Sequence, residues 1–295
     1  MLFEDAVQLY LVQLMADGRS VHTRLQYGRH LRLLGHYLRE HRIEEVLHVD
    51  LAQFLSSRVA THTAEGRAKK ASAVNALRSS IKTFFGYLST ARFIPSNPAL
   101  LVRRARTGSP APRSLSDGDR ERLVAALAGA KTDAERRDRA LFMTLLTAGV
   151  RIGSALAANV GDVDFEDGVL RLRQMKGGGE NTVFVPRETV EFLRAFVGER
   201  RSGALFPGEG GKRLGQRQAH RRLRWWAKRA GIDRRISPHT LRHTFGMAVY
   251  GATGDLLVTA RALCHRSTSA TQVYARADLG RVRGAVEALT CVTTR

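Results

Sequence analysis

The segment Ile236–Gly246, with the sequence ISPHTLRHTFG, combines two histidines and an arginine within a few residues. His239 and His243 are four residues apart, a spacing that puts both on one face of a helix and that zinc enzymes use to bind metal. Ser237 and Pro238 favour a helix start, so His239 would lie in the first turn. The unpaired N–H groups of a first turn carry partial positive charge, which attracts anions and repels metal cations.

Two neighbouring residues also argue against a metal site. Arg242 adds a charge that does not titrate away, and Thr240 holds the position at which zinc proteases carry a glutamate. Leu241 and Phe245 would point the other way, toward a core. The segment therefore predicts an anion site, most simply for phosphate, and no bound metal.

Four more side chains could take part in chemistry. Arg151 follows Ala148–Val150 inside an apolar segment that we expect to be helical, so its charge needs an acidic or phosphate partner. Lys176 stands at the mouth of a glycine-rich turn. Taken singly, His265 at the end of an apolar stretch and Tyr274 nine residues later would be a capping histidine and a half-buried tyrosine.

The charge balance points to a polyanionic partner. Among 295 residues, 48 are basic and 27 acidic, which gives a net charge of +21 and makes nucleic acid the first candidate. A membrane surface is the second, but the basic residues are spread along the chain and no apolar run is long enough to span. Lysine accounts for 7 of the basic residues and arginine for 41, a bias that a GC-rich genome would largely explain.

The cysteine content and the first residues bear on location. Cys264 and Cys291 alone cannot build a disulfide framework or a four-cysteine zinc site. The opening MLFEDAVQLY lacks the basic and apolar regions of a secretory signal. These features favour a reducing cytoplasm as the location.

Residues 1–105 are expected to form a helical domain that clamps DNA. Its basic side chains Lys69, Lys70, Arg78 and Lys82 would contact DNA, with an ordinary solvated surface as the alternative. Two segments, 21–41 and 72–92, carry apolar residues at helical spacing. These residues are Leu25, Leu31, Leu34 and Tyr37 in the first segment, and Val74, Leu77, Ile81, Phe84, Phe85 and Leu88 in the second.

A linker at residues 106–115 and a second domain at 116–295 follow. Glycine, serine and prolines between flanking arginines indicate an exposed linker, and Ser116 is a plausible N-cap for the next helix. The second domain reads as mostly helical, with one β-hairpin in VLRLRQMKGGGENTVFVP.

The segment RQAHRRLRWWAKRAG predicts an amphipathic helix with a cationic face. Its outward stripe has no acidic member, which favours a helix that follows DNA phosphates over a solvated one. Arg217, Arg221, Arg224 and Lys228 form that stripe at i, i+4, i+7 and i+11, while Ala219, Leu223, Trp226 and Ala230 face a core.

Four segments in order resemble the motifs of the tyrosine recombinases, the Xer and phage-integrase-like site-specific recombinases. They are TAGVRIGSAL, MKGGGENTVFVP, SPHTLRHTFG and ALCHRSTSATQVYA. FFGYLSTARFIPSNPA resembles the helical, SAM-like core-binding domain of the same family. The resemblance implies a mainly α fold of two domains, in which an α+β catalytic domain with a small β-hairpin or sheet follows the core-binding domain.

The resemblance also implies a role for each candidate residue. Tyr274 would be the nucleophile, and Arg151 and Arg242 would bind the non-bridging oxygens of the scissile phosphate. Lys176 would protonate the leaving 5′ oxygen. His239 would act as general base or acid at the tyrosine oxygen, and His265 would hydrogen-bond the phosphoryl group.

Two positions depart from the family pattern. Ser154 stands three residues after Arg151, where the family carries an acidic residue that orients the arginine; Asp162 or Asp164 could take over that task. Cys264 stands where the family has glycine, and we expect this small residue to be tolerated. No role follows for His243, which we expect to support the fold or the neighbouring groups without touching the phosphate.

The implied activity is site-specific DNA recombination through a 3′-phosphotyrosyl intermediate and a Holliday junction, without metal, ATP or another cofactor. The implied assembly is a homotetramer on two double-stranded DNA sites, with an accessory recombinase or directionality protein as a further partner. The implied location is a prokaryotic cytoplasm, in association with the nucleoid. The segment from Asp278 would dock on a neighbouring protomer or on its own domain. Two alternatives stay open: a type IB topoisomerase, and a DNA-binding clamp with an impaired site.

Overall fold

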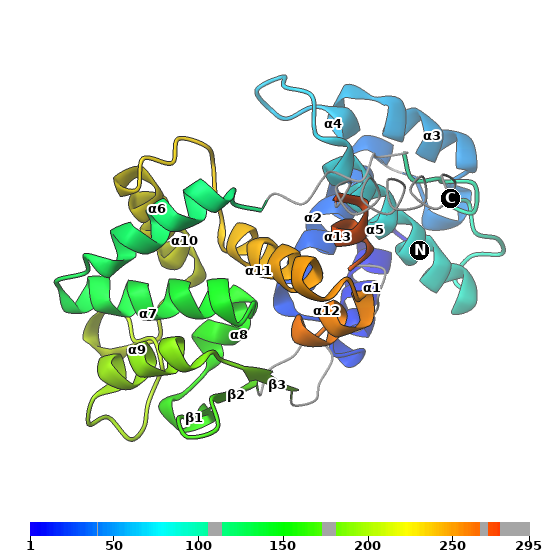
Figure 1. Cartoon of the computed structure of the whole chain (residues 1–295). Coiled ribbons are helices and arrows are strands. Elements are labelled where there is room, and N and C mark those ends of the chain that lie inside the picture. The colour runs from blue at the N-terminus through cyan, green and yellow to red at the C-terminus, as the bar shows by residue number, and fades with distance from the viewer. Residues whose placement is uncertain (40, 106–113, 173–180, 266–270, 278–295) are drawn as a thin grey trace, which may run out of the picture. The chain divides into compact units, whose positions relative to one another are not determined.

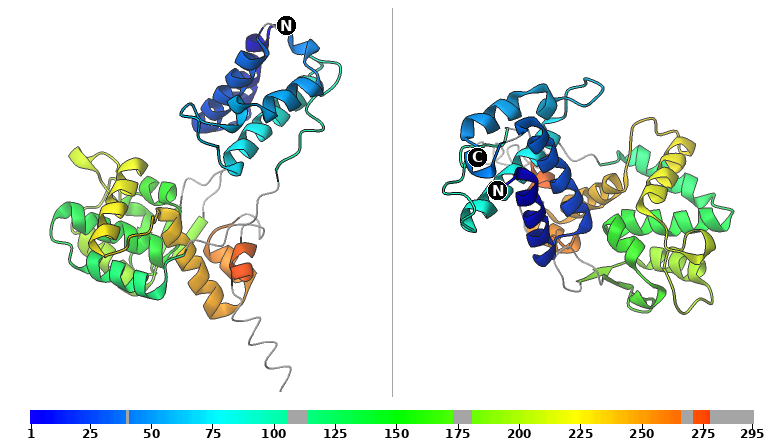
Figure 2. Two further views of the ribbon diagram at one scale, coloured as in Figure 1. Left: turned by 90° about the horizontal axis from the view of Figure 1, so that it is seen from above. Right: turned by 180° about the vertical axis from the view of Figure 1, so that it is seen from behind.

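The computed structural model describes residues 1–39, 41–105, 114–172, 181–265 and 271–277. The chain divides into two compact units, Met1–Gly108 and Ser109–Arg295. Both are built mainly from helices, as the sequence predicts (Figures 1 and 2). The expected linker falls mostly outside the described residues, so its boundaries stay a prediction.

The first unit is a helical bundle in which α1 packs on α2, and α5 packs on both. Figure 1 shows these helices in blue to cyan. Its elements are α1 (Phe3–Ala16), α2 (Val21–Leu38), η1 (Ile43–Glu45), α3 (His48–Ser56), α4 (Arg58–Thr61) and α5 (Ala71–Thr90).

The core of this unit confirms the predicted face of α5. Phe84 is fully buried, and its ring lies 5.6 Å from that of Phe3 and 5.5 Å from that of Tyr10, measured between centroids. The predicted helix at α2 is confirmed, but its apolar spacing does not bury every member: Leu25 is 64% exposed, whereas Leu31 is buried. Leu25 and Leu31 are six positions apart, which places them about 120° from each other around the helix axis, so Leu25 lies beyond the edge of the apolar face.

The second unit contains the sheet and the remaining helices (Figure 1). Its helices α7 and α9 pack on each other, and α11 packs on α7 and α12. Its elements are α6 (Asp117–Ala128), α7 (Asp133–Thr147), α8 (Ile152–Ala157), η2 (Val160–Asp162), β1 (Val163–Asp164), β2 (Val169–Leu172), β3 (Asn181–Phe184), α9 (Arg187–Val197), η3 (Glu209–Gly211), α10 (Gln216–Arg229), α11 (Pro238–Thr253), α12 (Leu256–Ala262) and α13 (Gln272–Ala277).

The predicted hairpin is confirmed as the antiparallel pair β2 and β3. Leu170 lies opposite Val183 in the register, and both side chains are buried. The short strand β1, which two residues are too few to predict, pairs with the other edge of β2. The turn with Lys176 lies outside the described residues.

A buried carboxylate holds α10 on α7. Asp138 is fully buried, and its Oδ1 accepts hydrogen bonds from the guanidinium of Arg137. Its Oδ2 accepts one from Arg222 Nε, at 2.5 Å, and one from Trp226 Nε1, at 3.0 Å. Because both oxygens have cationic or N–H partners, the charge is compensated, and α10 is fixed in rotation about its axis.

Several arginines of this unit donate to backbone carbonyls. Arg213 donates to the carbonyls of Leu156 and Ala158, at 3.1 Å each, and thereby caps the end of α8. Such contacts satisfy the carbonyls that a helix leaves unpaired at its C-terminus. Further arginines that donate to a backbone carbonyl are Arg136, Arg137, Arg194, Arg200, Arg234 and Arg242.

Within the described residues, no helix is both long and apolar enough to cross a membrane.

Candidate active site

The start of α11 forms as the sequence predicts. Ser237 caps the helix, with its hydroxyl 3.4 Å from the N–H of Thr240, and Pro238 is the first helical residue. His239 is exposed in the first turn, while Leu241 is fully buried beneath it. The helix therefore holds its polar first turn at the surface of the unit by anchoring the opposite side in the core.

Arg242 ties three segments together at this site. Its side chain is buried, and its two terminal nitrogens donate to the carbonyls of Gly149 and Leu263, at 2.5 Å each. One carbonyl precedes α8, and the other follows α12. A guanidinium carries five N–H donors, so about three remain for an anion.

Arg151 lies beside this tie but outside any helix, so the expectation of a helical position is wrong. It occupies the N-cap position of α8, with an extended backbone at φ −70° and ψ 141°. The helix α7 ends before it because Gly149 adopts a φ of +60°. A Cβ at Gly149 would stand 2.2 Å from Phe245 Cδ1, so only glycine fits between the two helices.

Tyr274 lies on α13 with its phenol turned into the unit, and only 1% of its surface is exposed. Its hydroxyl lies 3.2 Å from His243 Nδ1, and the two ring centroids are 5.9 Å apart. The close approach depends on Gly246, where a Cβ would stand 2.5 Å from Tyr274 Cζ. The tyrosine is therefore more buried than its isolated segment suggests.

The sequence predicts a supporting role for His243 but does not predict its contact with the tyrosine. The available signal was the glycine three residues after His243, on the same face of α11, which leaves room for a ring from elsewhere. His265 has a different partner, since its Nδ1 lies 2.9 Å from Thr271 Oγ1. Thr271 is fully buried, so this contact attaches the segment before Tyr274 to the end of α12.

The surroundings of the site lower the pKa of its three histidines, which favours their neutral form. Burial, together with the charges of Arg242 and Arg151, lowers the pKa of His265 to about 4. Partial desolvation of its ring and the same arginines lower the pKa of His239, and burial and His239 lower that of His243. Neutral imidazole rings can accept a proton, which is what a general base requires.

Arg242 and Tyr274 respond to burial in opposite ways. Burial and the neighbouring Arg151 lower the pKa of Arg242 to about 10, so it keeps its charge at neutral pH. Burial raises the pKa of the Tyr274 phenol, and Arg242 opposes that rise. Arg242 is thus close enough to Tyr274 to favour its ionised form.

Three further residues that the sequence singles out have different outcomes. Lys176 lies outside the described residues. Asp164 accepts hydrogen bonds from the N–H groups of Glu166 and Asp167, so its carboxylate is occupied in its own turn. Cys264 has a φ of +47°, which explains why glycine suits that position.

The cationic stripe of α10 is present on an exposed face. Arg217, Arg221, Arg224 and Lys228 are exposed, and the residues predicted to face the core are buried. A hollow of about 490 Å³ lies between α10 and the loop before α11. Its lining adds two basic residues that the sequence did not single out, His220 and Arg235.

The lysines of the first unit differ in exposure and in their hydrogen bonds. Lys70 and Lys82 are exposed, as a surface contact requires. Lys69 donates its ammonium to the carbonyls of Val59, at 3.0 Å, and Ala60, at 3.1 Å. This lysine therefore holds α4 in place, and its contact with DNA stays a prediction.

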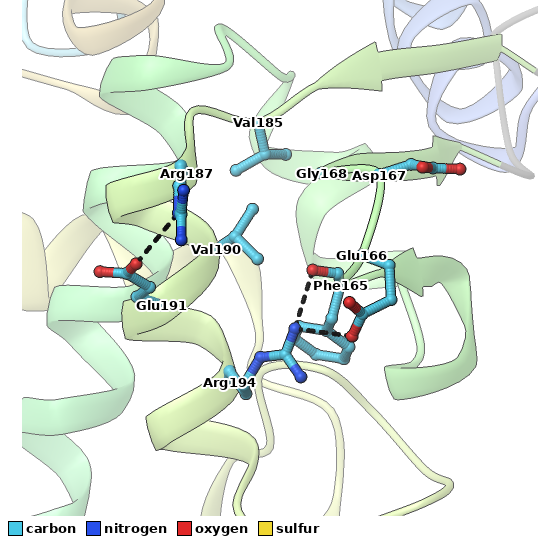
Figure 3. A pocket seen from close by; sticks show the side chains of 9 residues that line it. All are labelled: Phe165, Glu166, Asp167, Gly168, Val185, Arg187, Val190, Glu191 and Arg194. Atoms are coloured by element: carbon cyan, nitrogen blue, oxygen red, sulfur yellow. Dashed lines mark hydrogen bonds and ion pairs between the residues drawn. The ribbon is translucent and has the colours of Figure 1, made fainter.

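A second hollow, of about 450 Å³, lies between the turn at Phe165–Gly168 and the start of α9 (Figure 3). Figure 3 shows Arg194 reaching the Phe165 carbonyl and the Glu166 carboxylate, while Arg187 pairs with Glu191. Its carboxylates neutralise its arginines. The hollow therefore does not suit a phosphodiester, unlike the cluster around Arg242.

Among the residues that the structure describes, no group of three or more histidine, cysteine, aspartate or glutamate side chains could hold a metal ion.

Comparisons with known proteins place this geometry in a family. Residues 113–281 match the phage integrase family, and residues 7–92 match the SAM-like N-terminal domain of phage integrases. The chain is 32% identical to tyrosine recombinase XerC of Chromobacterium violaceum, covering 93% of this chain and 91% of that protein. It is 30% identical to tyrosine recombinase XerD of Pseudomonas putida, covering 91% of each.

A solved structure shares the fold. The XerH site-specific recombinase, bound to a palindromic difH substrate in a post-cleavage complex, superposes with a TM-score of 0.74 at 20% identity. The match covers 95% of this chain and 84% of that one. With the family match over most of the chain, these findings identify the chain as a member of the phage integrase family of tyrosine recombinases.

Proposed function

We propose that this protein catalyses site-specific recombination of double-stranded DNA, with Tyr274 as the nucleophile. The observation that carries the proposal is the convergence of Arg151, Arg242, His239, His265 and Tyr274 within one unit. Their chemistry fits attack on a phosphodiester, because fixed positive charge and neutral bases surround a phenol.

In the proposed step, Tyr274 Oη forms a bond to phosphorus and the bond from phosphorus to the 5′ oxygen breaks. His239 takes the phenol proton, and Lys176 gives a proton to the leaving 5′ oxygen. The link that remains is a 3′-phosphotyrosine, which conserves the energy of the phosphodiester. A free 5′ hydroxyl of the partner strand then attacks it, so that strands rejoin without ATP.

The electrostatics support this division of labour. A phenol has a pKa of about 10, and burial raises the pKa of Tyr274 further, so its proton must leave as the bond forms. Arg151 and the free donors of Arg242 would stabilise the charge on the phosphorane. His265 would donate to the same phosphoryl oxygens from its Nε2, because its Nδ1 is engaged with Thr271.

DNA binding is proposed for the stripe on α10 and for Lys69, Lys70 and Lys82 of the first unit. Lys70, Lys82 and the four cations of the stripe are exposed, whereas Lys69 is partly covered and bonded to carbonyls. Cations that neutralise phosphates displace condensed counterions from the DNA, which favours binding. In full, the reaction would use a homotetramer on two sites and pass through a Holliday junction. The same chemistry suits a nucleoid-associated enzyme, alone or with an accessory recombinase or directionality protein.

The test is covalent trapping on a nicked duplex. Sites are first selected from a random duplex library by binding to the wild-type protein, and nicked versions then trap the protein that has cleaved. We expect a denaturation-resistant protein–DNA adduct with wild type and with the control Tyr27→Phe. Tyr274→Phe should bind the duplex equally well and yield no adduct.

Two outcomes would replace this proposal. If wild type binds the selected duplex but traps no adduct, the protein is a DNA-binding clamp, and the replacement of the acidic residue by Ser154 is the first suspect. If wild type relaxes supercoiled plasmids that carry no selected site as efficiently as those that do, it acts as a type IB topoisomerase.

A further inference from the structure

An exposed tryptophan stands beside the cationic stripe of α10. Trp225 is 41% exposed, whereas its neighbour Trp226 is fully buried. Trp225 follows Arg221 by four residues and precedes Lys228 by three, so it borders both on the helix surface. An indole left in water forgoes the favourable free energy of burial, which makes this placement informative.

The position of Trp225 is held by contacts with its neighbours on α10 and, through them, with a buried carboxylate. The guanidinium carbon of Arg222 lies 4.6 Å from the centre of the Trp225 ring. Arg222 is itself held by the buried carboxylate of Asp138, and the Trp225 ring meets that of Trp226 edge-on at 4.8 Å. The indole is thus fixed by a charge network and a buried ring, and binding would cost it little conformational entropy.

The surroundings of Trp225 are cationic. The charged neighbours on its own helix are Arg221, Arg222, Lys228 and Arg229. The packed helix α7 contributes Asp138, which is buried, and Glu135, which pairs with Arg229 at 3.3 Å. A surface that joins one aromatic ring to several cations suits a ligand that alternates anionic and apolar groups.

We propose that Trp225 packs against a deoxyribose of the DNA backbone and donates its indole N–H to a flanking phosphate oxygen. No hydrogen bond from Trp225 Nε1 is found among the described residues, so the donor is available. Because the guanidinium groups of Arg222 and Arg229 both lie against the ring, an edge contact with a sugar suits the geometry better than stacking on a base. The proposal rests on DNA binding by α10 and adds a sequence-independent contact to it.

The test exploits the fact that the chain has two tryptophans. A short mixed-sequence DNA duplex is titrated at low salt into the wild-type protein, and tryptophan emission is followed alongside binding by anisotropy of the labelled duplex. We expect the emission to change with saturation. In Trp225→Phe, which keeps Trp226 as a reporter of folding, the duplex should still bind and the emission change should be lost.

The affinity of a second variant separates this contact from an ionic one. Trp225→Ala should weaken binding about five- to tenfold and leave the slope of log Kd against log salt unchanged, because no phosphate charge is neutralised. The matched control Arg224→Ala should reduce that slope by about one. An affinity of Trp225→Ala equal to that of wild type overturns the inference.

Other outcomes also decide the matter. An emission change that survives in Trp225→Phe places the responding tryptophan elsewhere and overturns the inference. So does a Trp225 emission that follows protein concentration and not DNA, because the ring would then be a contact between protein copies. If wild type fails to bind any duplex, the proposed function falls together with this inference.

Discussion

Arg242 is expected to bind the scissile phosphate, yet two of its N–H donors form hydrogen bonds to backbone carbonyls of the protein. Replacing it with lysine keeps the charge and removes the planar fork. The carbonyls of Gly149 and Leu263 lie on different segments, and a single ammonium on a flexible stem cannot reproduce both contacts. The substitution therefore tests a structural role that is separate from any role in catalysis.

The magnitude follows from the contacts. A hydrogen bond from a charged donor contributes about 1.5–3 kcal/mol, and a buried carbonyl left without a partner costs about 1–3 kcal/mol. If lysine keeps one of the two contacts, we expect Arg242→Lys to lower the free energy of unfolding by about 2–4 kcal/mol. With a urea slope of about 2 kcal/mol per molar, the midpoint should fall by about 1–2 M.

Tryptophan emission provides the assay, because both tryptophans lie in the second unit. Urea unfolding followed at Trp226 therefore reports that unit and not the helical bundle of the first. The matched control is Arg221→Lys, an exposed position of α10, which should unfold at the wild-type midpoint. Equal midpoints for Arg242→Lys and Arg221→Lys would refute the reasoning, since the two carbonyl contacts would then contribute nothing to stability.

Three further predictions concern the same unit. Gly149→Ala should cost about 3 kcal/mol or more in urea unfolding, because its Cβ meets Phe245 and its φ is +60°. Gly203→Ala, at φ +88° with nothing within 4 Å, should cost about 1 kcal/mol, and equal costs would count against the packing argument. The folded pKa of His265 lies near 4 and its ordinary value near 6.5, so the unfolded chain takes up that proton first as the pH falls. The full difference corresponds to about 3 kcal/mol at pH 4, and solvent screening of the partly exposed ring reduces it, so stability present above pH 6.5 should fall by about 2 kcal/mol toward pH 4. The fall should be shallower in His265→Asn, and an unchanged profile would exclude His265 as its source. At Cys264, with its φ of +47°, thermal stability should rank glycine at or above cysteine, and cysteine above valine by about 1–2 kcal/mol; a valine variant as stable as wild type would show that the backbone there is not strained.

Local signals in the sequence predicted the elements well. The apolar spacing of α5, the serine and proline at the start of α11, and the alternation of β2 and β3 each depend on residues close together in the chain. Burial of Val74 and Phe84, and exposure of Lys228, follow from the same periodicity. Because local backbone geometry determines these features, they can be predicted from the sequence.

The errors and omissions lie where distant segments meet. The apolar neighbours of Arg151 predict a helical position, which the structure contradicts. The helix α7 ends before Arg151 at Gly149, whose positive φ and missing side chain allow close contact with Phe245, nearly a hundred residues later. The pairing of His243 with Tyr274 likewise depends on how α13 packs on α11. Motif order indicates which residues share a site, but their catalytic roles stay predictions until they are tested.

The arginines that bind carbonyls give the amino-acid composition a second meaning. An excess of arginine can arise by drift of a genome toward GC-rich codons, without any benefit to the protein. Once Arg213 holds the carbonyls of Leu156 and Ala158, and Arg242 those of Gly149 and Leu263, lysine no longer substitutes freely. Replacing either arginine by lysine would leave carbonyls without a partner, so these positions require arginine whatever the base composition of the genome.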